Sequence, residues 1–351
     1  MSMQKNEKFA FYDVIIVGSG PAGASAANEL VKSGYKVLVI EEKKLPRYKM
    51  CSGLIMDRSQ DLLLEKFGPL PPDVFSEPKA LKGIYFSKEG KVLLPLPLEK
   101  PEVWNVWRSS FDYWLVKQSG ADVWESHRLV GLSQTEDAVV ATILDSEKKH
   151  AEINASYLIG CDGGRSTVRK LIAPAFEKKV HYLPCIQIYC TGTVDLDPAY
   201  YYMFFDSDLH SFYTWLHIKD DYIVYGINCH PTQSAQQILK ESTDYLTGFF
   251  DLRIDKIEKK SGCVISDMPA KNNFFLGEKR VLLAGEAAGF VNLFGEGISP
   301  AIATGSLAGL SILSAKHSGE KVLSIYENET KNEKKLVIES WAQAGMFVKK
   351  T

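Results

Sequence analysis

The chain has 351 residues, of which 45% are hydrophobic, and its 41 basic and 43 acidic residues leave a net charge of −2. This length allows two domains, or one domain with a large insertion, around a substantial buried core. The near balance of charges argues against a general nucleic-acid binder, which would carry a basic excess.

The six cysteines include no C-x-x-C pair and no His/Cys cluster at zinc spacing, so we predict no metal site. Reduced thiols in a chain of this size favour a cytoplasmic location. The first residues are polar and mixed, and no stretch approaches the ~20 apolar residues of a membrane span. We therefore expect no transmembrane segment and at most a peripheral contact with a membrane.

The strongest local pattern is a strand, a glycine-rich turn, a helix and a second strand. Residues 12–17 form a short β-branched run, 21–33 carry a small-residue face, and 36–40 are a second apolar run. In the turn, Gly18 allows the tight bend, and Gly20 removes a side chain where a pyrophosphate would approach. Gly23 permits close packing of the helix on the strand.

The helix that follows would offer unpaired N–H groups and a favourable dipole to phosphates. Glu41 ends the second strand, 23 residues after Gly18, where it would accept hydrogen bonds from ribose hydroxyls. A tight turn without a ligand is the alternative, and the turn alone would serve NAD as well as FAD. The residues predicted to bind the cofactor here are Gly18, Gly20, Pro21, Ala22, Gly23 and Glu41.

Further along the chain, residues 54–67 predict a helix that a Gly-Pro-rich segment ends. Residues 83–86 and 91–94 predict a hairpin with its turn at 88–90, and 108–118 an aromatic-rich helix. Residues 181–263 are dense in aromatic residues and alternate in a way typical of antiparallel strands. Near the end of the chain, residues 305–315 and 322–347 are expected to be mostly helical.

Two later segments combine a short apolar strand with glycines and an acid. Residues 158–169 contain Cys161-Asp162-Gly163-Gly164, and residues 281–289 contain Gly285-Glu286. The second segment continues to Gly295-Glu296-Gly297-Ile298, whose backbone N–H groups at a helix start would stabilise negative charge on a bound cofactor. An ordinary helix-start loop is the alternative interpretation.

With the glycine turn, these segments resemble the sequence motifs of the flavoprotein monooxygenase superfamily, which has the p-hydroxybenzoate hydroxylase type of fold. The Asp162 segment is similar to its "DG" motif, and the Glu286 segment to the motif that meets the ribityl chain and pyrophosphate. The helix that begins at Arg108 resembles the one whose arginine lies near the cofactor. The resemblance implies bound FAD, with Arg108, Asp162, Gly285, Glu286, Gly295, Gly297 and Ile298 in the binding site.

Within the superfamily the chain most resembles the geranylgeranyl reductase family. Pro46–Gly53 is similar to its cysteine loop near the isoalloxazine, and Tyr213-Thr214-Trp215 to its aromatic substrate strand. The chain departs from the family in Glu286, where aspartate is usual, and in Ser52, where a glycine is usual. Ile218 lies where a proline is usual, and the C-terminal region is short. These departures weaken the inference about the substrate more than the inference about FAD.

The resemblance implies a reductase that transfers hydride from reduced FAD to a carbon–carbon double bond of an apolar, isoprenoid-like substrate. Its electrons would come from NAD(P)H or a ferredoxin-like protein. Cys51, which is also expected to contact the cofactor, and Tyr48 are the candidate catalytic residues, although a buried inert thiol is equally consistent with the sequence. Tyr213 and Trp215 would line the substrate pocket, or belong to an ordinary core. A flavin monooxygenase or halogenase, and a non-enzymatic flavin-bound redox sensor, are the alternatives.

The predicted fold is α/β. A discontinuous, Rossmann-like FAD-binding domain with a parallel sheet is assigned to residues 1–70, 98–175 and 266–330. A smaller substrate domain on an antiparallel sheet is assigned to residues 71–97 and 176–265. Residues 331–351 are expected to form a C-terminal helix.

Overall fold

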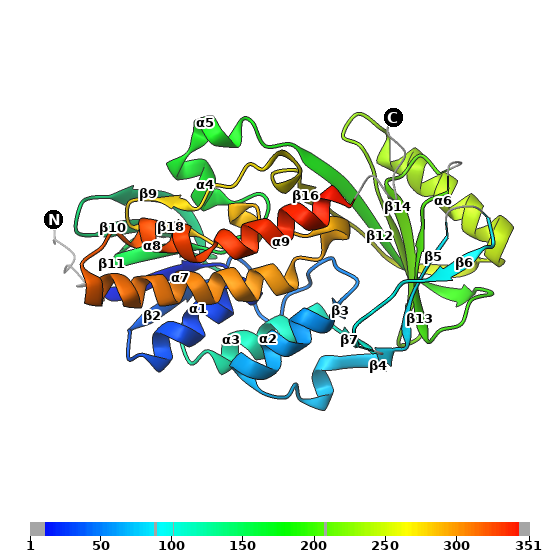
Figure 1. Cartoon of the computed structure of the whole chain (residues 1–351), viewed down its shortest axis with the longest axis horizontal. Coiled ribbons are helices and arrows are strands. Elements are labelled where there is room, and N and C mark those ends of the chain that lie inside the picture. The colour runs from blue at the N-terminus through cyan, green and yellow to red at the C-terminus, as the bar shows by residue number, and fades with distance from the viewer. Residues whose placement is uncertain (1–10, 88–89, 101, 207–208, 344–351) are drawn as a thin grey trace.

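The computed structural model describes residues 11–87, 90–100, 102–206 and 209–343. Two large sheets form the two halves of an elongated molecule, and a small sheet joins them along one side (Figure 1). The three-stranded small sheet consists of β3 (Leu54–Ile55), β7 (Val103–Val106) and β4 (Phe75–Leu81).

The first large sheet has eight strands and a parallel centre, because β18, β11, β1, β2 and β8 run in one direction. The apolar runs of β1 and β2 are almost completely buried, as is usual for strands with helices on both faces. The strands are β1 (Tyr12–Val17), β2 (Val37–Ile40), β8 (Asp122–Trp124), β9 (Arg128–Gln134), β10 (Val139–Leu144), β11 (His150–Gly160), β17 (Gly277–Glu278) and β18 (Val281–Leu283).

The helix α1 (Pro21–Lys32) packs on this sheet, and α7 (Ile298–Ser318) packs closely on α1. A Cβ atom at Gly305 would lie 2.1 Å from the carbonyl oxygen of Ala22, so small residues permit the close approach of the two helices. Among the described residues α7 is the one helix long and apolar enough to cross a membrane. It is mostly buried inside the protein, as a core helix is.

The remaining helices surround the parallel sheet, except α6, which lies on the second half (Figure 1). They are α2 (Asp57–Phe67), α3 (Arg108–Gln118), α4 (Thr167–Ile172), α5 (Pro174–Glu177), α6 (Ala235–Phe250), α8 (Val322–Glu329) and α9 (Lys331–Ala342). Single 3-10 turns occur at Pro72–Val74, Pro269–Lys271, Gly285–Ala288 and Leu293–Gly295.

The second large sheet has seven strands, and all of its neighbouring pairs are antiparallel except β13 with β5. One face packs on α6 through a core that includes Phe204, Leu216 and Leu246. The other face carries Tyr201, Met203, Tyr213 and Trp215 and looks toward the first half. The strands are β5 (Gly83–Ser87), β6 (Leu93–Pro95), β12 (Tyr182–Thr193), β13 (Tyr200–Phe204), β14 (Tyr213–Lys219), β15 (Tyr222–Asn228) and β16 (Arg253–Ser266).

The predicted α/β fold, with one parallel-centred sheet and one antiparallel sheet, is confirmed. Local boundaries differ. The helix expected at 54–67 begins only at Asp57, because residues 54–55 pair with β7 as a strand. The helix expected at 322–347 divides at Thr330 into α8 and α9, and the buried Tyr326 fastens the end of α8 to the carbonyl of Leu283.

The helix expected at 305–315 is longer and runs from Ile298 to Ser318. The predicted turn at 88–90 and the C-terminal segment 331–351 lie partly outside the described residues. The assignment of domain limits remains a prediction.

Candidate functional site

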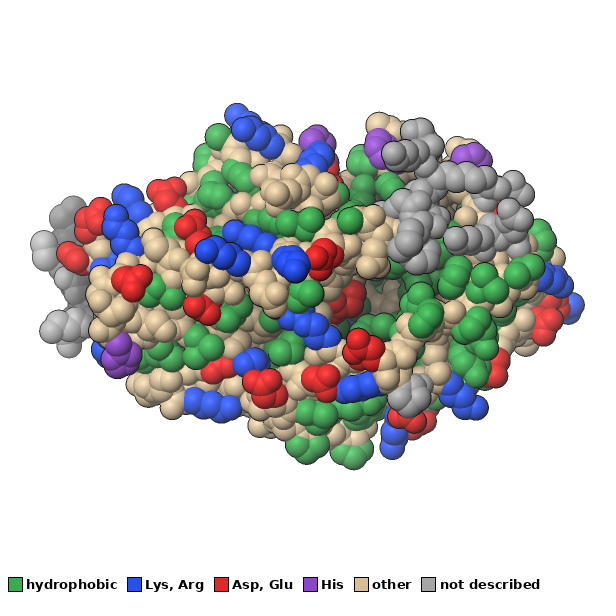
Figure 2. All heavy atoms as spheres, in the orientation of Figure 1, with side chains coloured by type: hydrophobic (Ala, Val, Ile, Leu, Met, Phe, Trp, Pro, Cys, Tyr) green, Lys and Arg blue, Asp and Glu red, His purple; other side chains and the backbone are tan. Residues whose placement is uncertain are grey.

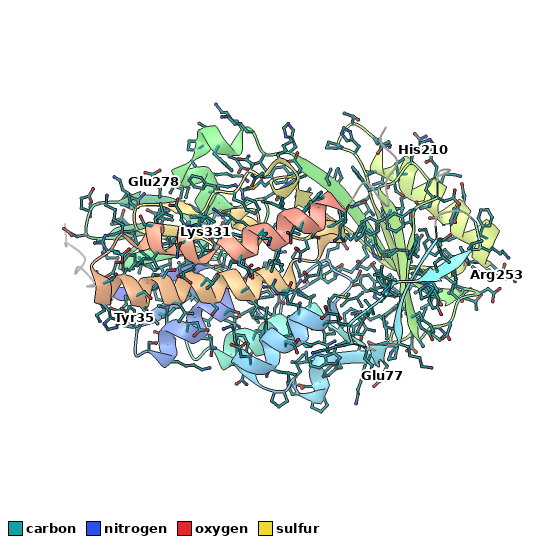
Figure 3. All side chains as sticks on the ribbon, in the orientation of Figure 1. Tyr35, Glu77, His210, Arg253, Glu278 and Lys331 are labelled. Atoms are coloured by element: carbon teal, nitrogen blue, oxygen red, sulfur yellow. The ribbon has the colours of Figure 1, made fainter. Side chains whose placement is uncertain are left out.

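A cavity of about 770 Å³ opens between the two large sheets. Its lining comes from the carboxyl ends of β1, β2, β11 and β18 on one side, and from β12, β13, β14 and β16 on the other. Figure 2 shows the face hollowed between the two halves, with hydrophobic side chains gathered beside the hollow over the second half. Side chains from both halves fill the space around it, between the surface residues Tyr35 on one half and Arg253 on the other (Figure 3).

Three glycines of the first turn have separate structural roles. Gly18 has a φ of +105°, and a Cβ atom there would lie 2.5 Å from the Cys161 carbonyl oxygen. A Cβ at Gly23 would lie 2.0 Å from the Gly18 carbonyl oxygen. Gly20 has extended backbone, and its nearest neighbour would be an Arg47 nitrogen at 3.7 Å. Gly18 and Gly23 are therefore required by the protein's own packing, whereas the space at Gly20 is open.

Four alternating charges lie beside this turn. Glu41 forms an ion pair with Arg47 at 3.1 Å and accepts a hydrogen bond from the Ser19 hydroxyl at 2.6 Å. Arg47 also pairs with Asp112 at 3.0 Å, and Asp112 accepts two hydrogen bonds from Arg108 at 2.7 and 2.9 Å. Burial acts to raise the pKa of Glu41, but Arg47 and the hydrogen bonds to its carboxylate lower it overall.

The Asp162 loop presents a buried acceptor to the cavity. The Asp162 Oδ2 atom accepts backbone hydrogen bonds from Thr167 at 2.6 Å and Val168 at 3.1 Å. Its Oδ1 atom is buried and has no hydrogen-bond partner among the described residues. Because buried acceptors are normally satisfied, this atom marks a position for a donor that the chain does not supply. Burial raises the pKa of Asp162.

Glu286 lies next to the Asp162 loop. Its Oε1 atom accepts a hydrogen bond from the Ser266 backbone at 3.1 Å, and a Cβ atom at Gly164 would lie 2.5 Å from it. The glycine at 164 therefore accommodates a glutamate that is one methylene longer than the aspartate expected by resemblance. Burial raises the pKa of Glu286, while Lys49 opposes this shift.

The third segment, Gly295–Ile298, lies at the start of α7, as predicted. Glu296 holds it by accepting hydrogen bonds from the Asn292 side chain at 2.6 Å and the Ser299 backbone at 2.8 Å. The Tyr213 hydroxyl donates to the Phe294 carbonyl at 2.7 Å, so a strand of the second sheet fastens this loop. Ile298, Gly285, Gly295 and Gly297 all line the cavity.

The Cys51 loop lines the cavity where it packs on the second sheet. Cys51 is partly buried, lines the cavity and is a hydrogen-bond partner of Arg108. Burial acts to lower the pKa of Arg108, but Asp112 and Cys51 raise it overall. The Tyr48 hydroxyl is 2.6 Å from the Ser261 hydroxyl, and the Lys259 ammonium lies over its ring at 3.2 Å. Tyr48 is therefore held at the cavity rim by the edge strand β16.

Alternate residues of β14 line one face of that strand. Tyr213 and Trp215 border the cavity, and His217 and Lys219 continue the same face behind the Cys51 loop. His217 is fully buried, and neither ring nitrogen meets hydrogen-bond geometry with any described residue. The Lys219 ammonium donates to the Val106 carbonyl at 2.6 Å, and burial lowers its pKa to about 7.

Sequence reasoning missed Arg47, Asp112, Lys219 and the strand-borne thiols Cys185 and Cys263, all close to or lining the cavity. One sequence signal could have located Lys219. It lies two residues after His217 on a predicted strand, so the two side chains are expected on the same face of that strand. His210 is exposed, and its Nδ1 atom lies 3.0 Å from the Glu241 carboxylate on α6 (Figure 3).

These features fit FAD. The space over Gly20 is open, and a pyrophosphate can approach there because glycine has no side chain. The α1 N-terminus offers backbone N–H groups beside this space. The buried Asp162 Oδ1 atom can accept from a hydroxyl of the cofactor. The cavity continues from this end to the Gly295–Ile298 loop and the Cys51 loop, which leaves room for the flavin ring between the sheets.

The fold and the cavity thus define a flavin-dependent oxidoreductase with a dinucleotide-binding βαβ unit. The model of the FAD binding domain family matches residues 11–329, and the chain belongs to this family.

Individual relatives extend the comparison. The chain is 28% identical over 315 residues to an uncharacterised protein, Mbar_A1602, of Methanosarcina barkeri, covering 88% of this chain and 76% of that one. Its fold is similar to that of a geranylgeranyl bacteriochlorophyll reductase-like protein from Thermoplasma acidophilum, with a TM-score of 0.78 and 21% identity over 96% and 86% of the two chains.

A monooxygenase and a halogenase share the fold as well. A p-nitrophenol 4-monooxygenase from Pseudomonas putida has a TM-score of 0.74 at 16% identity, covering 97% of this chain and 90% of the other. The myxobacterial chondrochloren halogenase has the same TM-score and identity, over 96% and 82%. The architecture therefore accommodates reductases, monooxygenases and halogenases alike.

Proposed function

We propose that this protein is an FAD-dependent reductase that saturates carbon–carbon double bonds of an apolar, isoprenoid-like substrate. The observation that carries the proposal is the Cys51 loop, which lies against an apolar wall of the cavity: the Ser52 hydroxyl is 3.3 Å from the Tyr201 hydroxyl, and Met50 packs in one cluster with Trp215. That wall is formed by aromatic and aliphatic side chains of the second sheet and its edge, namely Ile84, Leu96, Tyr201, Met203, Tyr213 and Trp215.

Bound, reduced FAD supplies a hydride to one alkene carbon. The chain's own residues then complete the addition. The Cys51 thiol donates its proton to the neighbouring carbon, and the guanidinium of Arg108 stabilises the thiolate that remains. Lys219, whose pKa is lowered to about 7 by burial, lies near Cys51 and can return a proton to it at neutral pH.

The cofactor contacts follow from the same geometry. Glu41 would accept from the adenosine ribose once its Ser19 contact rearranges, and the backbone at Pro21 and Ala22 would meet the pyrophosphate. Arg108 would lie near the flavin with Cys51. Asp162 and Glu286 would accept hydrogen bonds along the ribityl chain, and Gly285, Gly295, Gly297 and Ile298 would contact the flavin end.

An apolar, lipid-like substrate suits the edge of the second sheet. Val92 and Leu94 are 62% and 45% exposed, and Leu96 on the same segment lines the cavity. This segment provides a route for peripheral contact with a membrane that holds the substrate. We place the protein in the cytoplasm, where NAD(P)H or a ferredoxin-like protein supplies electrons.

The test is a single turnover without oxygen. The FAD-loaded protein is reduced anaerobically, mixed with geranylgeranyl diphosphate, and the product is analysed by mass spectrometry. A gain of two hydrogens per double bond, lost in Cys51→Ala but kept in the distant Cys190→Ser, is the expected result. A product that forms only when oxygen is admitted, or with chloride and oxygen, would instead assign a monooxygenase or halogenase.

The redox-sensor alternative makes a different prediction. A sensor would give no product under any of these conditions, although its flavin would still change oxidation state. In that outcome the apolar wall of the cavity would serve a partner or ligand rather than a reacting alkene.

A further inference from the structure

Two cysteines lie directly opposite each other in the wall of the cavity. Cys185 on β12 and Cys263 on β16 are partners in the antiparallel ladder, in a stretch of regular register. Directly opposed residues in such a pair project to the same face of the sheet. Both side chains line the cavity, so the face they share is the one that looks toward the cofactor.

The spacing of this pair suits a disulfide. Opposed residues of an antiparallel ladder have Cα atoms about 4.5 or 5.5 Å apart, depending on the type of pair. Both values fall within the roughly 4.4–6.8 Å that disulfides span. The two cysteines are therefore placed to join or separate without movement of the backbone. Both are free thiols in this structure.

The pair also lies beside the flavin-side loop. Ile265 follows Cys263 by two residues, so its side chain shares the same face of β16. A Cβ atom at Gly295 would lie 2.8 Å from the Cδ1 atom of Ile265, which shows that this part of β16 packs directly on the loop. Tyr213 lies beside both thiols, and its hydroxyl donates a hydrogen bond to the carbonyl of Phe294, the residue before Gly295.

We propose that Cys185 and Cys263 form a redox-active dithiol that exchanges two electrons with the bound flavin. In the exchange the two thiols lose two electrons and two protons, and one sulfur–sulfur bond forms. Both electrons and both protons pass to oxidised FAD. The reverse direction reduces the disulfide and regenerates oxidised FAD, so no further reactant is needed. This activity does not depend on the identity of the alkene substrate.

The electrostatic surroundings shift the pKa values of the two thiols in opposite directions and so give them different roles. The hydrogen bond from Cys185, together with the positive charge of Lys49, lowers the pKa of Cys263 against the effect of burial. The same hydrogen bond and burial raise the pKa of Cys185. Cys263 is then the thiolate that attacks, and Cys185 supplies the second sulfur, as in dithiol oxidoreductases.

The experiment measures how many electrons the protein takes up per bound FAD. FAD-loaded protein is oxidised with diamide, freed of the reagent and titrated anaerobically with dithionite while the flavin absorbance is followed. Wild type should take up about four electrons per FAD, two for the flavin and two for the disulfide. Cys263→Ser and Cys185→Ser should take up about two. Cys190→Ser is the matched control, because Cys190 lies on the same strand but is buried against α6, and it should behave as wild type.

Mass spectrometry of the alkylated protein gives an independent reading. After diamide the peptides carrying Cys185 and Cys263 should be linked, and after the titration both should carry the alkyl label. If a serine variant loses FAD, the Cys185–Cys263 linkage in the wild-type protein still tests the proposal. Wild type that takes up only two electrons, free thiols after diamide, or a link from Cys51 to either cysteine would overturn the proposal.

Discussion

At the scale of single residues, the glycine turn shows that one motif combines two kinds of requirement. A side chain at Gly18 or Gly23 would collide with the backbone of the protein itself. A side chain at Gly20 would meet no backbone atom and would extend into the cavity. The glycine at position 20 is therefore needed for binding of the ligand, and the glycines at positions 18 and 23 are needed for the fold.

This difference predicts the behaviour of Gly20→Val. The variant should fold, because residue 20 has extended backbone and open space, but its side chain should occupy the pyrophosphate position. We expect the Kd for FAD to rise by at least about 100-fold, equivalent to ~2.7 kcal/mol. Absorbance of the purified protein and titration of the apoprotein with FAD measure the change.

Gly248→Val is the control, since Gly248 lies on α6 and a Cβ atom there would meet nothing within 4 Å. It should retain FAD. A fully loaded, yellow Gly20→Val protein would contradict our placement of the pyrophosphate.

At the scale of elements, α3 carries the acid on which the charge network depends. Asp112 is fully buried and accepts from Arg108 one turn earlier and from Arg47 on a distant loop. Removal of the carboxylate would leave the largely buried Arg108 guanidinium without its ion-pair partner and would leave Arg47 paired with Glu41 alone. Asp112→Ala should therefore lower the free energy of unfolding by about 3–5 kcal/mol.

A matched pair on another helix provides the comparison. Lys240 and Asp244 on α6 have the same i,i+4 spacing, but both side chains are exposed. Asp244→Ala should change stability by less than about 0.5 kcal/mol, because exposed ion pairs contribute little. Urea unfolding of both variants tests the contrast, and equal losses would show that the Asp112 network is not buried as described.

The strand β14 makes a prediction about pH. Burial lowers the pKa of Lys219 from 10.5 to about 7, so the folded protein binds fewer protons than the unfolded chain between these values. Stability should therefore rise with pH across this window, by at most about 1.4 kcal/mol per pH unit from this group. Below pH 7 the ammonium is charged in both states, and the contribution no longer changes.

Lys219→Met should remove this part of the pH dependence while preserving the packing of the aliphatic stem. The measurement is urea unfolding of both proteins at pH 7 and pH 9, where the gain of the wild type should exceed that of the variant by about 1–2 kcal/mol. Lys335→Met on the exposed side of α9 should keep the wild-type profile. Parallel profiles for wild type and Lys219→Met would mean that Lys219 keeps its ordinary pKa when folded.

At the scale of the whole molecule, the cavity lies between two sheets whose main cores are separate and are connected by a smaller core that contains Met50, Val103 and Trp215. A ligand that contacts both sheets stabilises both. At a free FAD concentration of 100 times Kd, the folded state should gain ~2.7 kcal/mol, which corresponds to a rise in Tm of about 4 °C. Calorimetry of the apoprotein with increasing FAD should show one transition that moves upward.

The same titration on Gly20→Val provides the control, because that variant should shift by less than about 1 °C over the same concentrations. Two transitions, of which FAD moves only one, would show that the ligand stabilises one half alone. That result would contradict a cofactor bound between the sheets.

Local pattern was sufficient to predict much of this protein. The run from Tyr12 to Glu41 specifies strand, turn, helix and strand through short-range sterics and hydrophobic period, and the structure has each of them. The acids at 162 and 286 follow buried strands, and parallel strands end at one edge of a sheet. The two loops therefore had to meet at the glycine turn, and membership of the FAD binding domain family agrees with that inference.

Long-range partnerships were beyond the reach of sequence. Asp112 is 65 residues from Arg47, and Cys185 is 78 residues before Cys263, so no local propensity couples them. Strand register, which pairs Cys185 with Cys263, depends on which faces are buried in the assembled sheet. The lowered pKa of Lys219 likewise arises from burial that only the packing of β14 behind the Cys51 loop creates. The sequence alone specified the helices, the strands and the cofactor. The tertiary structure determined the charges and the contacts of the site, because these depend on distances between segments that are remote in the chain.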